Sequence, residues 1–492
     1  MEQIPVLIPL FLILAALVSF LLGTWRRALA YPVASLGAGL SFAIALWGLI
    51  TVLNNGPQHY YLGGWVAPIG IEYVLDHLSA FMIILVTGIG LLCIIYSLRP
   101  VQTELGERSV FTYPLMLLLL AGLSGIVLTG DLFNLYVFLE IASISAYALI
   151  GSGDGRAPVA ALRYLIMGTL GASCYLIGVG FIYSVTGSLN MSDVASLLPG
   201  LYQSRLIIGA VALMVIGLGL KMAIFPLHLW LPDAYTYAPS AISALIAPLM
   251  TKVAAYILIR LLISVFSPHY LGDVLSVTPI LGILGAIGII AGSIMAIAQH
   301  NLKRMLAYSS VAQISYIALG IGLGNPIGLV GAMLHIMNHA VMKGSLFQIA
   351  GALQLQGLVE VNDLAGVGRK LPYTMGAFTV AALSMVGIPP ACGFFSKWYL
   401  AAGCIEAGNW VFLSALIIGS LLTAVYFFRV LEKVYTSPDV PQVTSRYSRP
   451  CLSMLIPILM LAIAIIGLGL ANSFIVEYLL EPAASTAIWS GR

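Results

Sequence analysis

The sequence predicts an all-α membrane protein whose chain crosses the bilayer about fourteen times. Hydrophobic residues make up 61% of the 492 residues, charged residues make up only 8%, and the mean hydropathy is +1.04. A soluble protein with one buried core does not have this composition. Apolar stretches long enough to cross a hydrocarbon core of about 30 Å recur along the whole chain. The links between them are too short to hold a soluble domain.

The expected spans lie at residues 5–23, 30–53, 78–98, 110–129, 131–151, 158–186, 204–224, 240–266, 276–298, 304–323, 326–353, 371–400, 410–430 and 451–471. The longest links run from Asn54 to Tyr73 and from Thr436 to Pro450, and the residues after Asn472 are expected to be amphipathic or frayed. The first stretch lacks a basic segment and a small-residue cleavage site, so we interpret it as a retained span rather than a removed signal peptide.

The basic residues predict the orientation of the chain. Links on one side hold thirteen Lys and Arg, whereas those on the other side hold only Arg205 and Arg492. The thirteen are Arg26, Arg27, Arg99, Arg108, Arg156, Lys303, Arg304, Arg369, Lys370, Arg429, Lys433, Arg446 and Arg449. Because links rich in Lys and Arg stay in the cytoplasm, we expect a multi-pass protein of a prokaryotic cell membrane with both termini outside.

The sequence shows no motif for a cofactor, a metal ion or nucleic acid. The five cysteines are scattered through apolar segments without CxxC spacing, and the net charge is only +3. This pattern indicates neither a disulfide framework nor an iron–sulfur or zinc site. We expect that the chain binds no cofactor, no metal and no nucleic acid.

Glu140 lies near the middle of the span DLFNLYVFLEIASISAYALIG, residues 131–151. A carboxylate at mid-membrane costs at least ~2.5 kcal/mol, so it is retained where another group pairs with it or where its proton is used. Six of the 21 Lys and Arg also fall inside spans: Arg163, Lys221, Lys252, Arg260, Lys343 and Lys397. These are the candidate partners of Glu140.

Prolines predict interruptions in two of the spans. Pro226 follows Lys221 in LKMAIFPLHLW, and Pro389 and Pro390 lie in mid-span about two turns before Lys397. Proline lacks a backbone donor and breaks a helix, which leaves carbonyls free at membrane depth. Interrupted helices at corresponding places in two halves predict an internal repeat around an ion path. We expect His228 and Asp233 at the cytoplasmic mouth of the first interruption.

His335, His339 and Lys343 occur at positions i, i+4 and i+8 of one span. They share one helix face with a rise of ~6 Å between neighbours, so a proton could pass along them through intervening water. Together with Glu140, Lys221, Lys252 and Lys397 they form the predicted proton relay.

Each of these residues also has a structural interpretation. A basic residue near a span end can extend its charge to the interface, which applies to Lys252, Arg260 and Lys343. Membrane histidines such as His335 and His339 also act as hydrogen-bond donors between helices. Glu140 and Lys221 could form a purely structural ion pair, and Arg163 could connect two helices. Asp76 and His77 could simply cap a helix. The prolines could kink helices for packing.

Several segments closely resemble a known family. They are DLFNLYVFLEIASISAYALIG, LKMAIFPLHLWLPDAYTYAPSAISALIAPLMTKVAAYILIR, NLKRMLAYSSVAQISYIALG, HIMNHAVMKGSLFQIAGAL and GIPPACGFFSKWY, in this order, and they cover most of residues 110–400. The resemblance is to the antiporter-like subunits shared by Mrp-type multisubunit Na⁺/H⁺ antiporters, membrane-bound hydrogenases and respiratory complex I. It is strongest for the D-type subunits of Mrp antiporters and their hydrogenase counterparts. One complex I subunit has a glutamate at the position of Lys397, whereas others have lysine.

The resemblance implies a bundle of fourteen helices with two inverted five-helix repeats, in which helices seven and twelve are discontinuous. The expected divisions are residues 1–109 for three N-terminal helices, 110–266 and 267–435 for the repeats, and 436–492 for a last helix and tail. It implies that Glu140 pairs with Lys221, that Lys252 and His335 bridge to the centre, and that Lys397 ends the relay. It also implies partner membrane subunits, including a homologous antiporter-like one, and no redox cofactor.

The sequence-based hypothesis is therefore a proton-translocating subunit of a multisubunit antiporter exchanging protons for a monovalent cation, sodium above all. The first alternative is a pumping subunit of a hydrogenase or a quinone-linked NADH dehydrogenase. The second is a scaffold subunit that transports nothing. A self-sufficient carrier of an organic substrate fits less well, because the polar residues inside the spans are titratable groups and do not outline a substrate pocket.

Overall fold

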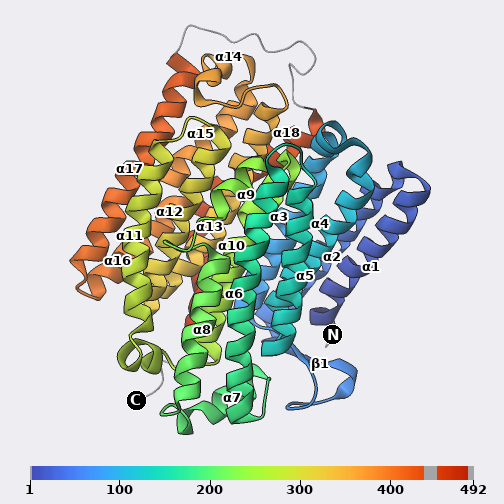
Figure 1. Ribbon diagram of the computed structural model, residues 1–492. Helices are drawn as coiled ribbons and strands as arrows, with labels where there is room; N and C mark the ends of the chain where they lie inside the picture. The colour runs from blue at the N-terminus through green and yellow to red at the C-terminus, as the bar shows by residue number, and fades with distance from the viewer. Residues whose placement is uncertain (1–2, 437–450, 486–492) are drawn as a thin grey trace.

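The computed structural model describes residues 3–436 and 451–485 and consists of long helices packed side by side (Figure 1). The helices are α1 (Ile4–Trp25), α2 (Ala30–Asn55), α3 (His77–Pro100), α4 (Ser109–Leu128), α5 (Leu132–Gly151), α6 (Ala157–Thr186), α7 (Met191–Leu197), α8 (Arg205–Met222), α9 (Leu231–Tyr237), α10 (Ser240–Ser264), α11 (Val277–Ile297), α12 (Leu302–Gly322), α13 (Pro326–Gln354), α14 (Val367–Lys370), α15 (Pro372–Val386), α16 (Cys392–Glu406), α17 (Trp410–Thr436), α18 (Leu452–Leu470), α19 (Asn472–Ile475) and α20 (Glu481–Ser485). Residues 437–450 of the second long link, and Arg446, Arg449 and Arg492, lie outside the described residues.

The long helices coincide with the fourteen spans expected from the sequence. Eleven helical segments of the described chain are long and apolar enough to cross a membrane, and one of them, residues 77–128, comprises both α3 and α4. The remaining two expected spans correspond to α13 and to the pair α15 and α16. The prediction of an all-α multi-pass membrane protein is confirmed.

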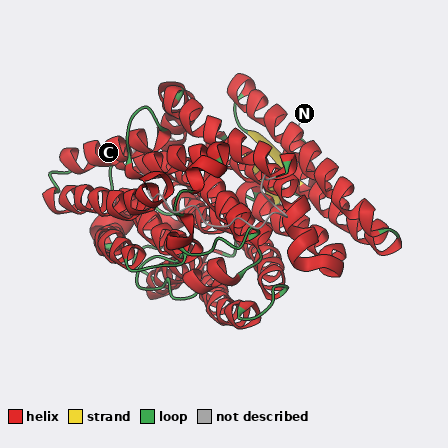
Figure 2. Ribbon diagram, turned by 90° about the horizontal axis from the view of Figure 1, so that it is seen from above, coloured by secondary structure: helices red, strands yellow, loops and turns green. Residues whose placement is uncertain are grey.

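One short hairpin departs from the helical prediction (Figure 2). Strands β1 (Gln58–Tyr61) and β2 (Glu72–Leu75) pair antiparallel within the long link after α2, for which no element was predicted. Aromatic and β-branched residues in QHYY and EYVL favour strands. The hairpin contacts the link before α5, where Gly130 N donates to Glu72 O over 2.8 Å.

Two matching sets of backbone contacts indicate the internal repeat. The link before α5 pairs with the link before α7, and the link before α12 pairs in the same way with the link after α13. The hydrogen bonds are Leu132 N to Leu189 O, Met191 N to Gly130 O, Leu302 N to Val359 O and Val361 N to His300 O. The first set lies at the end of the bundle with α7 and the second at the end with α14 (Figure 1). Equivalent contacts at opposite ends are expected of inverted repeats, so we propose repeat boundaries at 110–266 and 267–435.

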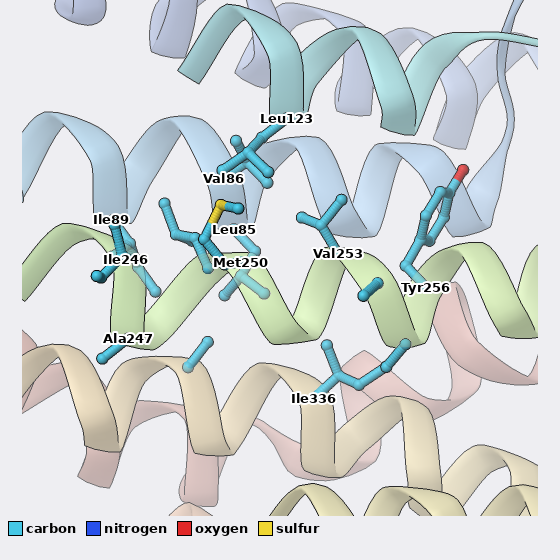
Figure 3. Close-up of a cluster of buried hydrophobic side chains, with 14 of the residues drawn as sticks. Leu85, Val86, Ile89, Leu123, Ile246, Ala247, Met250, Val253, Tyr256 and Ile336 are labelled. Carbon is cyan, nitrogen blue, oxygen red and sulfur yellow. The ribbon is translucent and has the colours of Figure 1, made fainter. Parts of the chain in front are cut away.

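Helix α10 forms the buried centre of the first half, because its membrane-spanning window is fully buried. Figure 3 shows aliphatic side chains from α3, α4, α10 and α13 packed together, among them Leu85, Leu123, Val253 and Ile336. Packing of this kind excludes water and lowers the local dielectric constant. A charged group on α10 therefore lies where its protonation depends strongly on the few polar atoms around it.

Candidate functional site

Glu140 on α5 and Lys221 on α8 lie together inside the first half of the bundle. The Lys221 Nζ atom is 4.0 Å from Glu140 Oε1 and donates a hydrogen bond of 2.7 Å to Ser143 Oγ. Ser143 follows Glu140 by about one turn of α5, so both side chains lie on the helix face that contacts Lys221. The Lys221 side chain is 6% exposed and that of Glu140 is 24% exposed. The lysine is therefore held by a hydroxyl, with the carboxylate at the outer limit of an ion pair.

The interruption expected beside Lys221 is confirmed. Helix α8 ends at Met222, Ala223 has φ of 58°, and helical structure resumes only at Leu231 in α9. Pro226 lies in the interruption, and so does His228, which is buried. Leu220 O, one of the carbonyls at the end of α8, accepts a hydrogen bond of 2.9 Å from Trp230 Nε1.

Lys252 on α10 is fully buried. Its Nζ atom donates to Ala247 O over 2.7 Å and lies 3.4 Å from Thr251 Oγ1. The structure describes no ion pair between Lys252 and a carboxylate of residues 3–436 or 451–485. Pro248 in the same helix has no N–H group to donate to Ala244 O. The Cys93 thiol donates a hydrogen bond to that carbonyl instead, with a distance of 3.2 Å. The alternative in which Lys252 reaches the membrane interface is wrong.

The face of α13 predicted to carry a ladder is buried throughout. The rings of His335 and His339 are 5.9 Å apart, centre to centre. His335 contacts Ser396 Oγ at 2.9 Å and Gln313 Oε1 at 3.0 Å. Neither nitrogen of His339 has a hydrogen-bond partner among the described residues. The imidazole of His339 is therefore held in place by packing against the described residues.

Lys343 completes this face and is also fully buried, so it does not reach the interface. Its Nζ atom donates to Leu306 O over 2.7 Å and to Ser309 Oγ over 2.5 Å. Helix α12 thus supports two members of the ladder, through Ser309 for Lys343 and Gln313 for His335. This supporting role was not predicted. The signal was present, since SSVAQ places polar residues four apart inside a span.

Lys397 on α16 lies at the second interruption, which is confirmed between Val386 and Cys392 around Pro389 and Pro390. The Lys397 Nζ atom donates to Met385 O and Val386 O over 2.9 and 3.0 Å, and to Ser420 Oγ over 3.1 Å. These carbonyls are at the C-terminus of α15, where the helix dipole favours a cation. The ammonium group also lies 5.0 Å from the centre of the Tyr316 ring, which is itself 5.6 Å from the His335 ring.

The structure thus places the relay residues of the second half, His335, His339, Lys343 and Lys397, near one another, and it keeps Glu140 and Lys221 together. Among the described residues, however, Lys221 and Lys252 make no direct contact.

The other two basic residues inside spans have acidic partners. Arg260 on α10 forms a two-bond ion pair with Asp76, which also caps α3 as expected, and Arg163 pairs with Asp233 at 2.5 Å. Asp233 lies 3.4 Å from Arg304 as well, so the half-helix α9 is anchored to α6 and α12.

The comparisons with known proteins agree on the family. Residues 129–423 match the family described as NADH:quinone oxidoreductase/Mrp antiporter, transmembrane region, and residues 65–99 match the N-terminus of complex I chain 5. The chain is 49% identical to NADH-quinone oxidoreductase subunit N of Desulforudis audaxviator, with 97% of each chain covered. It is 32% identical to the D-type subunit of the Na⁺/H⁺ antiporter of Bacillus subtilis, with 92% of this chain and 91% of the relative covered.

Solved structures match over nearly the whole length. A chain of an archaeal membrane-bound sulfane sulfur reductase has a TM-score of 0.90 at 29% identity, covering 98% of this chain and 97% of that one. A chain of the Mrp complex from Dietzia has a TM-score of 0.87 at 25% identity, covering 100% and 98%. The chain described here belongs to the family of antiporter-like membrane subunits that Mrp antiporters and NADH:quinone oxidoreductases share.

Proposed function

We propose that this chain is the proton-translocating subunit of a multisubunit antiporter that exchanges protons for a monovalent cation, which we take to be sodium. The observation that carries the proposal is the set of buried lysines without a carboxylate in contact. Among the described residues, Lys252, Lys343 and Lys397 bind only carbonyl and hydroxyl oxygens. A permanently charged, unpaired lysine is costly inside a membrane protein, whereas one that gains and loses a proton serves transport.

In this proposal Lys221 takes a proton from the cytoplasmic side and Glu140 sets its proton affinity. Lys252, His335, His339 and Lys343 then pass the proton to Lys397. The spacing of His335 and His339 suits transfer through one intervening water. Tyr316 lies next to both His335 and Lys397 and joins these two members of the proposed relay.

We assign the sodium path to surfaces shared with other membrane subunits, including a homologous antiporter-like subunit. Glu140 supports this assignment, because its side chain stays partly exposed where the relay begins and can therefore meet a neighbouring chain. The assembly would lie in a prokaryotic cell membrane. Fourteen crossings would place both ends of the chain on one side, which we assign to the outside.

Glu140→Gln tests the proposal. The substitution keeps the size of the side chain and removes its charge, so antiport by the assembled complex in everted vesicles should fall at least about tenfold. Glu107→Gln is the matched control, since Glu107 is 83% exposed in the link before α4, and it should leave the rate unchanged. Unchanged antiport by the Glu140→Gln complex, with normal assembly, would exclude a central role for Glu140.

A second candidate is a membrane subunit of a quinone-linked oxidoreductase or hydrogenase. The relative at 49% identity, named as subunit N of NADH-quinone oxidoreductase, favours it. Proteins that purify with this chain in mild detergent distinguish the two. Sodium-dependent antiport without bound metal clusters indicates the antiporter, whereas nickel or iron–sulfur subunits indicate the oxidoreductase. The remaining candidate, an inert scaffold, requires that Glu140→Gln and Lys221→Met together leave transport intact.

A further inference from the structure

Three buried tyrosines lie between the two parts of the proposed relay that have no direct contact. The Lys221 Nζ atom is 3.4 Å from the Tyr147 hydroxyl. The Tyr147 ring meets the Tyr164 ring edge-on at 4.7 Å, and Tyr164 stacks on Trp230 at 3.9 Å. Trp230 then meets Tyr235 of α9 edge-on at 6.3 Å. The aromatic contacts therefore run without interruption from Lys221 to the half-helix that follows the broken end of α8.

Tyr235 is the member of this series with an unexplained polar group. Its side chain is 0% exposed, and its hydroxyl has no hydrogen-bond partner among the described residues. The Thr251 side chain is near the Tyr235 hydroxyl but outside hydrogen-bonding geometry, and Thr251 Oγ1 is 3.4 Å from Lys252 Nζ. A buried hydroxyl without a partner costs about 1–3 kcal/mol, so its retention needs a reason. Phenylalanine would fill the same space at no such cost.

Tyr164 links the other two phenols. It is 1% exposed, and its ring contacts Tyr147 directly and Tyr235 through Trp230. Its ring is fixed between Tyr147 and Trp230. Because Trp230 is itself anchored by its bond to Leu220 O, next to Lys221, the whole series is tied to the broken end of α8.

We propose that the hydroxyls of Tyr147, Tyr164 and Tyr235, with bridging water, carry the proton from Lys221 to Lys252. This inference rests on the proposed function and supplies the connection between Lys221 and Lys252, which do not contact each other directly. At each phenol the oxygen accepts the incoming proton while its own O–H proton leaves toward the next oxygen, so no phenolate forms. The last transfer passes through Thr251. At the end the Lys221 ammonium has become a neutral amine and the neutral Lys252 amine has become an ammonium.

Tyr235→Phe is the decisive variant, because it removes one oxygen and keeps the ring contacts with Trp230 and Phe347. The assembled complex in everted vesicles should lose antiport at least about tenfold, with the half-saturating sodium concentration unchanged. Tyr235→His should restore antiport to within about threefold of the unmodified complex, since imidazole accepts and donates a proton at once. A tyrosine that only packs would be replaced by phenylalanine without loss and would gain nothing from histidine.

Tyr175→Phe is the matched control. Tyr175 is a fully buried tyrosine of α6 like Tyr164, but its hydroxyl donates to Leu132 O outside the series, and antiport per assembled complex should stay within about twofold. Full antiport in Tyr235→Phe combined with loss in Glu140→Gln overturns the tyrosine path and leaves the proposed function standing. Full antiport in both variants overturns the path together with the proposed function.

Discussion

The buried lysines differ from one another in the oxygen atoms around them. Lys221 has Glu140 nearby and a serine hydroxyl in contact, whereas Lys397 has two backbone carbonyls and a serine hydroxyl. A carboxylate favours the charged form of a lysine more strongly than a neutral carbonyl does. Of these two lysines, only Lys221 has a carboxylate nearby, so we assign the loading of the proposed relay to Lys221.

Lys397→Ala should abolish antiport without loss of assembly. The substitution removes the last titratable group of the proposed relay, and the Met385 and Val386 carbonyls that it frees lie at a helix end, where carbonyls have no partner within the helix. The measurement is sodium-driven proton movement in everted vesicles, normalised to the amount of assembled complex. Lys433→Ala, at an exposed position of α17, is the control. Full activity of the Lys397 variant would remove this residue from the relay.

At the scale of the elements, α12 determines the geometry of the second half. It offers Ser309 to Lys343 and Gln313 to His335, and it packs directly against α11. Glycine permits this approach, because a Cβ atom added at Gly285 would lie 2.7 Å from Leu319 N and 2.8 Å from Ser315 O. Backbone atoms cannot move aside as a flexible side chain can. The position of α12, and with it of Ser309 and Gln313, therefore depends on Gly285 of α11.

Gly285→Ala should destabilise the protein by about 1–3 kcal/mol, because the added methyl group pushes α12 away from α11. The measurement is thermal unfolding of the purified protein in detergent. Gly376→Ala provides the comparison, since a Cβ atom there meets nothing within 4 Å, and alanine in a helix interior is neutral or favourable by up to ~1 kcal/mol. Equal stability of the two variants would show that the α11 and α12 backbones can separate without penalty.

At the scale of the whole molecule, α3 and the hairpin are joined to the proposed first repeat at the hairpin end of the bundle. Arg260 of α10 donates to both carboxylate oxygens of Asp76 at the start of α3. The carboxylate of Glu72 in β2 accepts a bond of 2.6 Å from Asn190, the cap of α7. Both carboxylates are largely buried, so these bonds exchange little with water. Buried polar contacts therefore hold α3 to α10 and the hairpin to the start of α7.

Asp76→Asn should weaken this attachment by about 1.5–3 kcal/mol, the usual contribution of a hydrogen bond to a charged group. Asparagine caps a helix as well as aspartate does, so the capping of α3 is retained and only the ion pair is lost. The unfolding midpoint in detergent should fall. Asp154→Asn breaks an exposed ion pair with Arg108, and it should leave the unfolding midpoint unchanged within error. If both variants have the same unfolding midpoint, the ion pair between Arg260 and Asp76 contributes nothing to the attachment of α3 to α10.

The sequence by itself determined the spans, both interruptions and the seven titratable candidates. Hydrophobic length, proline chemistry and the cost of charge in hydrocarbon are local properties that a sequence displays directly. The tertiary structure alone decided which groups meet. It placed Ser309 and Gln313 beside the α13 ladder, paired Arg260 with Asp76, formed the hairpin and left the Tyr235 hydroxyl without a partner among the described residues. Contacts between helices depend on their rotation and crossing, and spans that are apolar on all faces do not encode these as a periodic pattern.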